Sequence, residues 1–445
     1  MLSLVSSQTL KEAEYVALSH RWGETVPGEV PSYCTNSENI DRRENGFLIG
    51  DLPATFRDAI EVTRQLDLQY LWIDSLCIIQ GDKKDWEQEA GRMKDVYASA
   101  YCTIAATSAS DSNSGFLKRA TNSEYICVQD NFGRRVCVCS HPADFDTDIE
   151  GAGLNSRAWV MQERFLSCRT IHFGARQMYW ECGEEVYCED MTRLTARSTR
   201  ADKYFRLDPE FPKRLHFMGA IPTINFLQSL LEDYSERGLS KVTDRAIALS
   251  GLSAHIATAL GCEESYGYGT FNLYLHRSLL WMRTDLQKKK IQYEDGEEAP
   301  SWSWMAYEGG IRFISLAELP FQNLEVFKDI KFVSSAQGEK KVLRTKVWNL
   351  PRCYLNRDAS VEGKSRILVS PGVEIGWIMP DGENFEMELA VVIGSVYSSE
   401  SRDKGEYYIL VVKEKEGENN SYERVGIGKI QYSYISRQDG DICLV

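Results

Sequence analysis

The sequence predicts an α/β fold, with a parallel sheet and added β-hairpins first, then a helical segment and a β-rich C-terminal domain. Strand-like and helix-like segments alternate between residues 14 and 106, as in a parallel sheet with crossover helices. The run at 70–80, Tyr-Leu-Trp-Ile-Asp-Ser-Leu-Cys-Ile-Ile-Gln, is apolar enough for a buried strand. Beyond residue 290, apolar segments alternate with glycine-rich and charged turns, which indicates further strands.

The length of 445 residues is too great for one ordinary core. We therefore expect three parts, at residues 1–200, 201–290 and 291–445. The polar stretch at 191–203 indicates the first boundary.

The first predicted strand is 14–19, and the polar segment His20-Arg21-Trp22-Gly23-Glu24 follows it. Residues 27–50 are rich in proline, glycine and asparagine and predict a long loop, a feature that is often functional. Pro53 and Thr55 open a helix, whose apolar side contains Phe56, Ala59, Ile60 and Thr63. The next elements are a strand at 70–79, a helix from Asp85 and a strand at 101–106.

Asp74 interrupts the apolar run. A carboxylate inside a buried strand is costly unless it has a partner. Ligands of open α/β sheets collect at the carboxyl ends of the strands. The strand at 70–79 therefore predicts a polar site beside it.

The next helix has a capping-box pattern, with Asp85 at its start and Gln88 three residues later. At about 100° per residue, one apolar stripe contains Trp86, Ala90, Met93, Val96 and Tyr97. Glu89 lies inside this stripe, whereas the neighbouring charged residues lie outside it. A carboxylate on the core side, just after a strand end, is a candidate site residue. The structural alternative is an ion pair with Arg57 or Arg21.

The remaining elements follow from periodicity and turn residues. We expect a hairpin at 125–139, a short helix at 157–165 that carries Trp159, Gln162 and Glu163, and a second hairpin from 169–173 and 177–182. Helical patterns cover 219–233, 243–260 with Asp244 as its cap, and 268–284. Later strands are expected at 342–347, 366–369, 374–378, 387–396, 407–412 and 424–435.

Composition excludes several classes of partner. The formal charge of −14 argues against nucleic acid and against an anionic membrane surface. No run approaches the roughly 20 apolar residues that span a bilayer. The twelve cysteines form no Cys-x-x-Cys pair and the six histidines are scattered, so neither indicates a metal site or a disulfide framework. Because residues 1–15 contain no signal peptide, we expect a cytoplasmic protein.

The common nucleotide and hydrolase fingerprints are missing: the sequence contains no Gly-x-Gly-x-x-Gly, P-loop, Gly-x-Ser-x-Gly or His-Glu-x-x-His motif. Polar and aromatic residues at the ends of elements remain as candidates. They are Ser19, His20, Arg21, Trp22, Asp74, Gln80, Trp86 and Glu89.

If the strands at 14–19 and 70–79 are neighbours, these groups converge on one rim of the sheet. Such groups suit a charged, aromatic ligand that contains ribose, because Arg holds phosphate, Trp stacks on a ring and carboxylates bind hydroxyls. A carboxylate there could also stabilise the oxocarbenium-like charge of a breaking glycosidic bond. The structural alternatives are core packing for Trp22 and Trp86, a structural hydrogen bond for His20 and a salt bridge for Arg21.

Three blocks of the sequence resemble the fungal heterokaryon-incompatibility (HET) domain. The first block is Tyr15–Gly23. The second consists of Leu52–Ile60, Tyr70–Gln80 and Asp85-Trp86 with Glu89, Met93 and Tyr97. The third consists of Arg157-Ala158-Trp159, Gln162-Glu163-Arg164 and Ser167-Cys168-Arg169, where the family usually has proline in place of Cys168. The blocks cover roughly residues 14–182, and Pro300–Trp304 resembles a segment common further along in HET proteins.

The resemblance implies a fungal protein of non-self recognition or regulated cell death. HET domains are distantly similar to TIR domains, which are flavodoxin-like modules of innate immunity, so it also implies a TIR/flavodoxin-like sheet. In TIR enzymes a helix-borne Glu shortly after a Trp carries NAD glycohydrolase activity. Trp86 and Glu89 look like this pair, at a spacing of three where TIR enzymes typically show four. Ser19-His20-Arg21 looks like the end of the first TIR strand. For Glu163 two roles stay open, a place in the site and a helix-end salt bridge, and we expect the salt bridge.

The leading hypothesis is an enzyme that binds NAD or a related nucleotide as substrate, needs no cofactor, and cleaves the nicotinamide–ribose bond. In it, Asp74 and Arg21 orient the ligand, Trp22 or Trp86 stacks, and Glu89 stabilises the developing charge. One alternative is a non-enzymatic signalling module that forms a homo-oligomer and binds a protein partner through its C-terminal region. Another is an enzyme that uses the same rim for a different small molecule.

Overall fold

The structure is a computed structural model of the chain. It describes residues 1–445 except 11–12, 25–28, 120–124, 140–144, 183–184, 195–218, 263–267, 288, 294–297, 316, 320–323, 327–329, 335–340, 362, 383–384, 386 and 399–400. Two compact units are present: Met1–Arg214 with Ile247–Leu252, and Leu215–Ala246 with Ser253–Val445. The predicted boundary at residue 200 lies outside the described residues.

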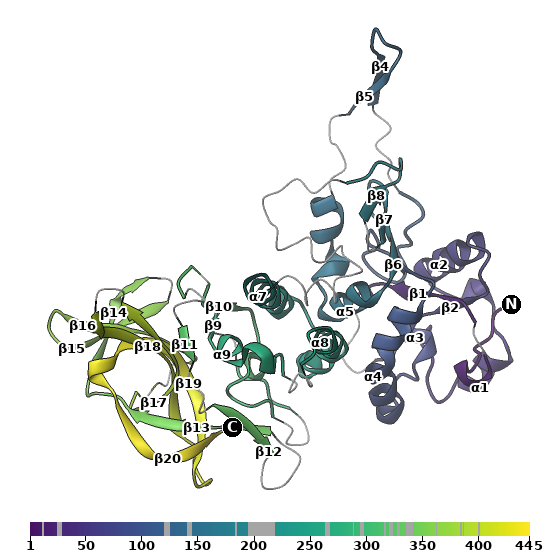
Figure 1. Ribbon diagram of the computed structural model, residues 1–445. Helices are drawn as coiled ribbons and strands as arrows, with labels where there is room; N and C mark the ends of the chain where they lie inside the picture. The colour runs from purple at the N-terminus through teal and green to yellow at the C-terminus, as the bar shows by residue number, and fades with distance from the viewer. Residues whose placement is uncertain are drawn as a thin grey trace. The chain divides into compact units, whose positions relative to one another are not determined.

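The N-terminal unit contains a six-stranded sheet in the order β2-β1-β3-β6-β7-β8 (Figure 1). Its strands are β1 Tyr15–Ser19, β2 Tyr70–Trp72, β3 Cys102–Ala105, β6 Arg169–Phe173, β7 Met178–Cys182 and β8 Glu185–Cys188. The first four strands are parallel, and β7 and β8 continue the sheet antiparallel. The prediction of a mixed α/β domain with a parallel sheet and an added hairpin is confirmed.

The helices of this unit are α1 Ile40–Asn45, α2 Ala54–Gln65, α3 Asp74–Cys77, α4 Lys83–Ser99 and α5 Ala158–Leu166. The predicted apolar side of α2 is buried, and Phe56 and Ala59 share a core with Leu18 of β1 and Ile104 of β3. On α4 the predicted stripe is confirmed as the inward side, with Ala90, Met93 and Tyr97 buried and Trp86 and Val96 half-buried.

The predicted strand at 70–79 is wrong after its third residue. β2 ends at Trp72, and Asp74 begins the short helix α3 instead of interrupting a strand. The Asp74 carboxylate accepts a hydrogen bond from the Ser75 backbone N–H at 2.6 Å, a local contact that favours a helix start over a strand. Leu76 on α3 and Ile78 directly after it are still buried, so these apolar residues pack in the core although they do not form a strand.

The start of α4 also differs from its prediction. Asp82 is the N-cap and accepts from the backbone N–H groups of Lys84 and Asp85. Asp85 instead accepts from the backbone N–H of Ile79 at 2.7 Å, which fixes the loop before the helix. The predicted loop at 27–50 is partly wrong, because it contains α1 and the 3₁₀ turn Ile49–Asp51.

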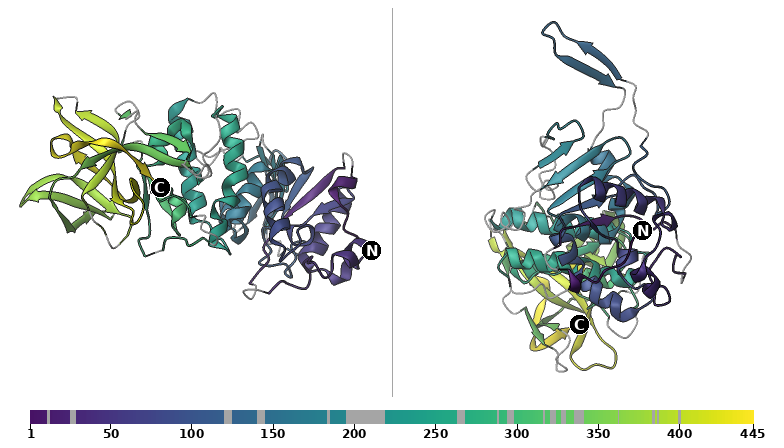
Figure 2. Two further views of the ribbon diagram at one scale, coloured as in Figure 1. Left: turned by 90° about the horizontal axis from the view of Figure 1, so that it is seen from below. Right: turned by 90° about the vertical axis from the view of Figure 1, so that its right-hand side faces the viewer.

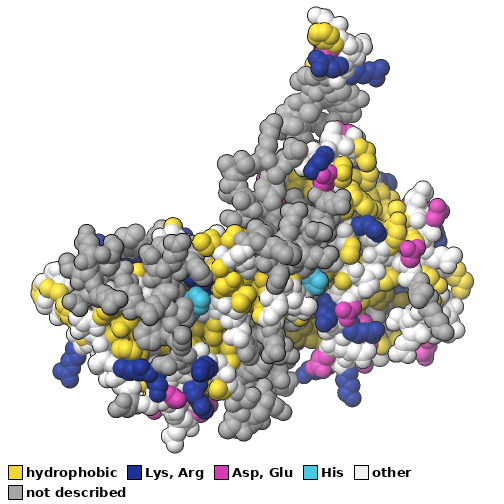
Figure 3. Space-filling model, viewed as in Figure 1, with side chains coloured by type: hydrophobic (Ala, Val, Ile, Leu, Met, Phe, Trp, Pro, Cys, Tyr) yellow, Lys and Arg dark blue, Asp and Glu magenta, His cyan; other side chains and the backbone are white. Residues whose placement is uncertain are grey.

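The hairpin predicted at 125–139 is confirmed as β4 Tyr125–Gln129 and β5 Arg135–Cys139, which form their own two-stranded sheet. Phe132 at its turn is 84% exposed, and Ile126 and Val128 on β4 are 71% and 51% exposed. Figure 3 shows hydrophobic and basic side chains together on this hairpin. A two-stranded sheet is only marginally stable in water by itself. Exposed apolar side chains on such a sheet are typical of a surface that contacts another molecule.

The other unit carries α7 Ala220–Glu236, most of α8 Ile247–Ala259, and α9 Leu275–Ser278. Two short strands, β9 Trp281–Arg283 and β10 Ile311–Phe313, pair antiparallel. The helix predicted at 268–284 is therefore largely wrong: α9 covers only Leu275–Ser278, and Trp281–Arg283 pairs as a strand with a segment far along the chain. The predicted cap Asp244 is also wrong, since Ala246 occupies the N-cap of α8.

Beyond residue 320 the unit is a ten-stranded sheet, as the sequence predicted (Figure 2). Its strands are β11 Leu324–Val326, β12 Lys331–Ser334, β13 Lys341–Asn349, β14 Tyr354–Val361, β15 Lys364–Ser370, β16 Val373–Pro380, β17 Leu389–Ser398, β18 Ser401–Glu414, β19 Ser421–Gln431 and β20 Ser436–Leu444. The strands β13, β20, β19, β18 and β17 form a closed ring, because β17 pairs with both β18 and β13.

Both faces of β17 are buried. Val391 and Ile393 belong to one core, whereas Ala390 and Val392 belong to another. Successive residues of a strand point to opposite faces, so this burial explains the continuous apolar run in the sequence. None of the helices in the described part of the chain has the length and apolar character needed to cross a membrane.

Candidate functional site

The candidate site lies beyond the carboxyl end of β1. This strand is central, with β2 on one side and β3 on the other, and all three are parallel. The chain leaves β1 toward β2 and then returns to the opposite side as β3, so the strand order reverses at β1. Open α/β sheets bind ligands at such a reversal, outside the carboxyl ends of the strands. His20, Arg21 and Trp22 occupy this position directly after Ser19.

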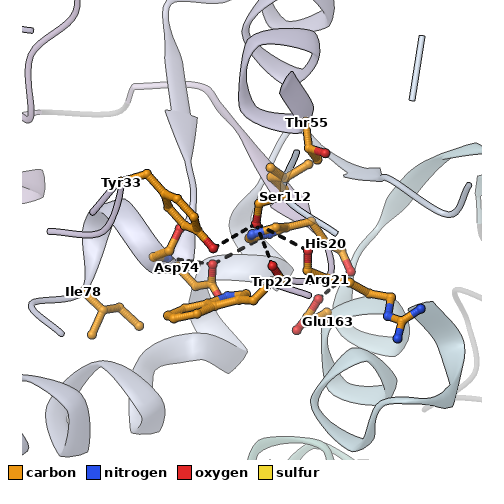
Figure 4. Close-up of polar contacts among 12 residues, drawn as sticks. His20, Arg21, Trp22, Tyr33, Thr55, Asp74, Ile78, Ser112 and Glu163 are labelled. Carbon is orange, nitrogen blue, oxygen red and sulfur yellow. Dashed lines mark hydrogen bonds and ion pairs between the residues drawn. The ribbon is translucent and has the colours of Figure 1, made fainter. Parts of the chain in front are cut away.

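Asp74 and Trp22 form the centre of the rim (Figure 4). The indole Nε1–H of Trp22 donates to Asp74 Oδ2 at 2.9 Å, while the other carboxylate oxygen accepts from the Ser75 backbone. The Asp74 side chain is 26% exposed, so the carboxylate is held in one orientation and still meets solvent. The structure thus brings Trp22 and Asp74 into contact, as the sequence predicted.

His20 is buried behind this pair. Its ring contacts Phe56 edge-on at 5.0 Å between centroids, and its Nδ1 lies 3.8 Å from Asp74 Oδ1. Burial lowers the pKa of His20 to about 4, and the nearby Asp74 carboxylate opposes this fall only partly. The imidazole is therefore neutral at neutral pH, so its contact with Asp74 is not an ion pair.

Glu163 of α5 reaches the same rim from the opposite side. Its Oε2 accepts a hydrogen bond from Ser19 Oγ at 2.5 Å, and the residue is 6% exposed. Burial raises the pKa of the Glu163 carboxyl from 4.5 to about 7, although the Arg157 guanidinium and the Ser19 hydrogen bond favour its ionised form. Arg157 is fixed nearby, because its Nη1 donates to the His20 carbonyl at 2.6 Å.

This position of Glu163 corrects the expectation from the sequence. The described residues include no salt bridge of Glu163, and its carboxylate instead belongs to the cluster at the end of β1. Trp159 lies one turn before Glu163 on α5 and is half-buried.

Two loop residues complete the wall beside Asp74. The Tyr33 hydroxyl and Ser112 Oγ are 3.1 Å apart, and Ser112 Oγ lies 3.3 Å from the Trp22 carbonyl, to which it can donate. Figure 4 shows both hydroxyls close to Asp74. No local pattern marks these residues, because each reaches the site from an irregular segment.

Gln80 has a supporting position. Its side-chain amide donates to the carbonyl of Ile78 at 3.1 Å, and its backbone N–H donates to Thr35 at 2.7 Å. These bonds hold the loop between α3 and α4. They leave the Gln80 amide engaged with the backbone of its own loop.

Glu89 lies in a different place. It lines a cavity of about 770 Å³ together with Tyr15 and Tyr70, which begin β1 and β2. Its carboxylate pairs with Arg92 at 2.8 Å, not with the Arg57 or Arg21 expected from the sequence, and its side chain is 16% exposed. The contacts among described residues do not connect Glu89 with Asp74 or Glu163. Trp86 is half-buried one turn before it on α4.

The cluster combines two aromatic rings with two carboxyl groups. Trp22 and Tyr33 supply the rings, the Asp74 carboxylate is oriented and partly exposed, and the Glu163 carboxyl has a pKa near neutral pH. Within the described residues, no group of three or more His, Cys, Asp or Glu side chains is placed to hold a metal ion.

The comparisons with known proteins identify one family. Residues 15–163 match the model of the family described as Heterokaryon incompatibility protein (HET), a span that begins at β1 and ends at Glu163. No curated protein and no solved structure matches the chain. Residues 15–163 of this chain therefore form a heterokaryon incompatibility (HET) domain.

Proposed function

We propose that this protein acts in fungal non-self recognition and that its HET domain binds NAD or a related nucleotide and cleaves the nicotinamide–ribose bond. The observation that carries this proposal is the buried Glu163 carboxylate, held by Ser19 at the end of β1 with a pKa of about 7. A carboxylate with this environment is typical of sites that handle charge or protons. The proposal places the reaction in the cytoplasm and requires no cofactor besides the substrate.

The strand order supports a likeness to TIR domains. The parallel strands run in the order β2-β1-β3-β6, which follows the flavodoxin-like arrangement of a second, first, third and fourth parallel strand. On this basis α5 follows the third strand and carries both Trp159 and Glu163. The pair with the TIR spacing then lies on α5, so the proposal assigns the catalytic role to Glu163 and not to Glu89.

The proposed mechanism uses charge that develops during bond cleavage. Trp22 stacks on the nicotinamide ring, and Asp74 binds the ribose hydroxyls. As neutral nicotinamide leaves, positive charge builds up on the ribose C1′ and ring oxygen, and ionised Glu163 stabilises it. Water then bonds to C1′ and Glu163 accepts its proton, so that nicotinamide, the ribosyl product and one proton are formed.

The first test measures nicotinamide release from NAD by the purified chain. Three variants are compared at matched concentration and folding: Glu163→Gln, Glu89→Gln and, as a control on the exposed side of α4, Glu87→Gln. We expect release by the wild type and by Glu87→Gln, and loss of at least about a hundredfold in Glu163→Gln. If nicotinamide release is lost only in Glu89→Gln, the catalytic carboxylate is Glu89 on α4 and not Glu163 on α5.

A second candidate function is signalling by self-association without catalysis. The observation that favours it is the hairpin β4–β5, whose Ile126, Val128 and Phe132 side chains are exposed. A second copy of the same apolar surface is the partner that this candidate implies. Light scattering would show size that rises with concentration, and Ile126→Asp with Val128→Asp would abolish that rise. If neither nicotinamide release nor association occurs, binding of another small molecule at the same rim becomes the preferred hypothesis.

A further inference from the structure

The guanidinium of Arg21 lies against the backbone of Gly153. Gly153 begins the 3₁₀ turn Gly153–Ser156 before α5, and a Cβ at Gly153 would lie 2.6 Å from Arg21 Nη1 and 3.4 Å from Cζ. The backbone at Gly153 does not have the left-handed conformation that would itself favour glycine. A side chain at Gly153 would therefore have to displace the end of the Arg21 side chain.

Arg21 differs from the other arginines of this region. Arg157 donates to the His20 carbonyl, and Arg164 is enclosed by the carboxylates of Glu150 and Glu181. The ion pairs and side-chain hydrogen bonds of the described residues include none from the Arg21 guanidinium. Among these three, Arg21 is the cation whose donors are available to a ligand, and it is only half-buried.

The direction of Arg21 places this cation at one end of the site. Figure 4 shows its side chain pointing away from both Asp74 and Glu163. In this view Glu163 lies between the Trp22–Asp74 pair and the Arg21 guanidinium.

From this arrangement we propose that Arg21, seated on Gly153, is a phosphate-binding group that restricts the site to nucleotides and disfavours nucleosides. The inference rests on the proposed function and names the part of the substrate that is recognised. With the glycosidic bond at Glu163 and the base at Trp22, the 5′-phosphate of the same ribose extends toward Arg21. A planar guanidinium offers paired donors that match phosphate oxygens, and such charge-assisted bonds are among the strongest in proteins.

The test compares nicotinamide mononucleotide with nicotinamide riboside, which lacks the phosphate. The full chain is assayed as wild type, Arg21→Gln, Gly153→Ala and, as a control, Arg57→Gln on the exposed side of α2. We expect Arg21→Gln to raise KM for the mononucleotide at least about tenfold with little change in kcat. Gly153→Ala should raise KM for the mononucleotide less than Arg21→Gln does, because the added methyl displaces only the flexible end of Arg21. KM for the riboside should stay within about twofold in all variants.

Two results would overturn the proposal: an equal change for mononucleotide and riboside, or no change for either. If no protein releases nicotinamide, the proposed function fails, and calorimetric binding of inorganic pyrophosphate then tests the subsite by itself. The phosphate subsite would be supported if pyrophosphate binds the wild type and binds both Arg21→Gln and Gly153→Ala more weakly. Equal binding by all variants, or no binding by the wild type, would refute it.

Discussion

Replacing Glu163 by Gln should make the protein more stable at alkaline pH. Burial raises the pKa of Glu163 from 4.5 to about 7, so the folded state holds the proton more tightly than the unfolded state does. The stability from this proton is fully present below about pH 4.5 and is lost as the pH rises through about 7. At about 1.4 kcal/mol for each pKa unit, the loss amounts to about 3 kcal/mol.

Glutamine keeps the shape and an oxygen that can accept from Ser19 Oγ, but it does not titrate. The free energy of unfolding of Glu163→Gln, relative to the wild type, should therefore rise by about 3 kcal/mol between pH 4.5 and pH 8. Urea denaturation of both proteins at four pH values, followed through the transition of the N-terminal unit, measures this difference. Glu87→Gln, at an exposed site on the same unit, is the control. Parallel stability curves for Glu163→Gln and the wild type would refute the argument that Glu163 is buried with a raised pKa.

Three further predictions concern pH and buried charge. If ionised Glu163 stabilises the transition state, kcat/KM should fall about tenfold per pH unit below about pH 7 and level off above it; a profile flat from pH 5 to 8 would contradict this role. Because burial lowers the pKa of His20 to about 4, stability should be lost as the pH falls from 6.5 toward 4, and His20→Gln should reduce this loss in thermal unfolding; identical acid sensitivity would count against it. Arg424→Met should destabilise the C-terminal unit by about 3–5 kcal/mol in urea, because it leaves the buried Asp381 carboxylate without its bidentate partner; a loss under about 1 kcal/mol would show that Asp381 is otherwise compensated.

Local patterns determined most of the elements near the site. The apolar runs of β1 and β3, the buried side of α2 and the stripe of α4 were predictable, because burial of one face imposes a period on the sequence. The polar group after β1 and Asp74 were also recognisable, since ionisable residues next to apolar runs stand out. The HET resemblance rests on these same stretches.

Tertiary structure decided which of these groups meet. Ser19 and Glu163 are 144 residues apart in the chain, and only the parallel order of β1, β3 and β6 brings α5 to the end of β1. Periodicity places Glu89 on the inward side of its helix, but it does not say what lies opposite, and it did not place Glu163 at all. Glu89 faces a cavity at the start of β1, whereas Glu163 faces the rim at its end. The sequence thus determined which faces are buried, and long-range packing alone determined which carboxylate joins the cluster at the end of β1.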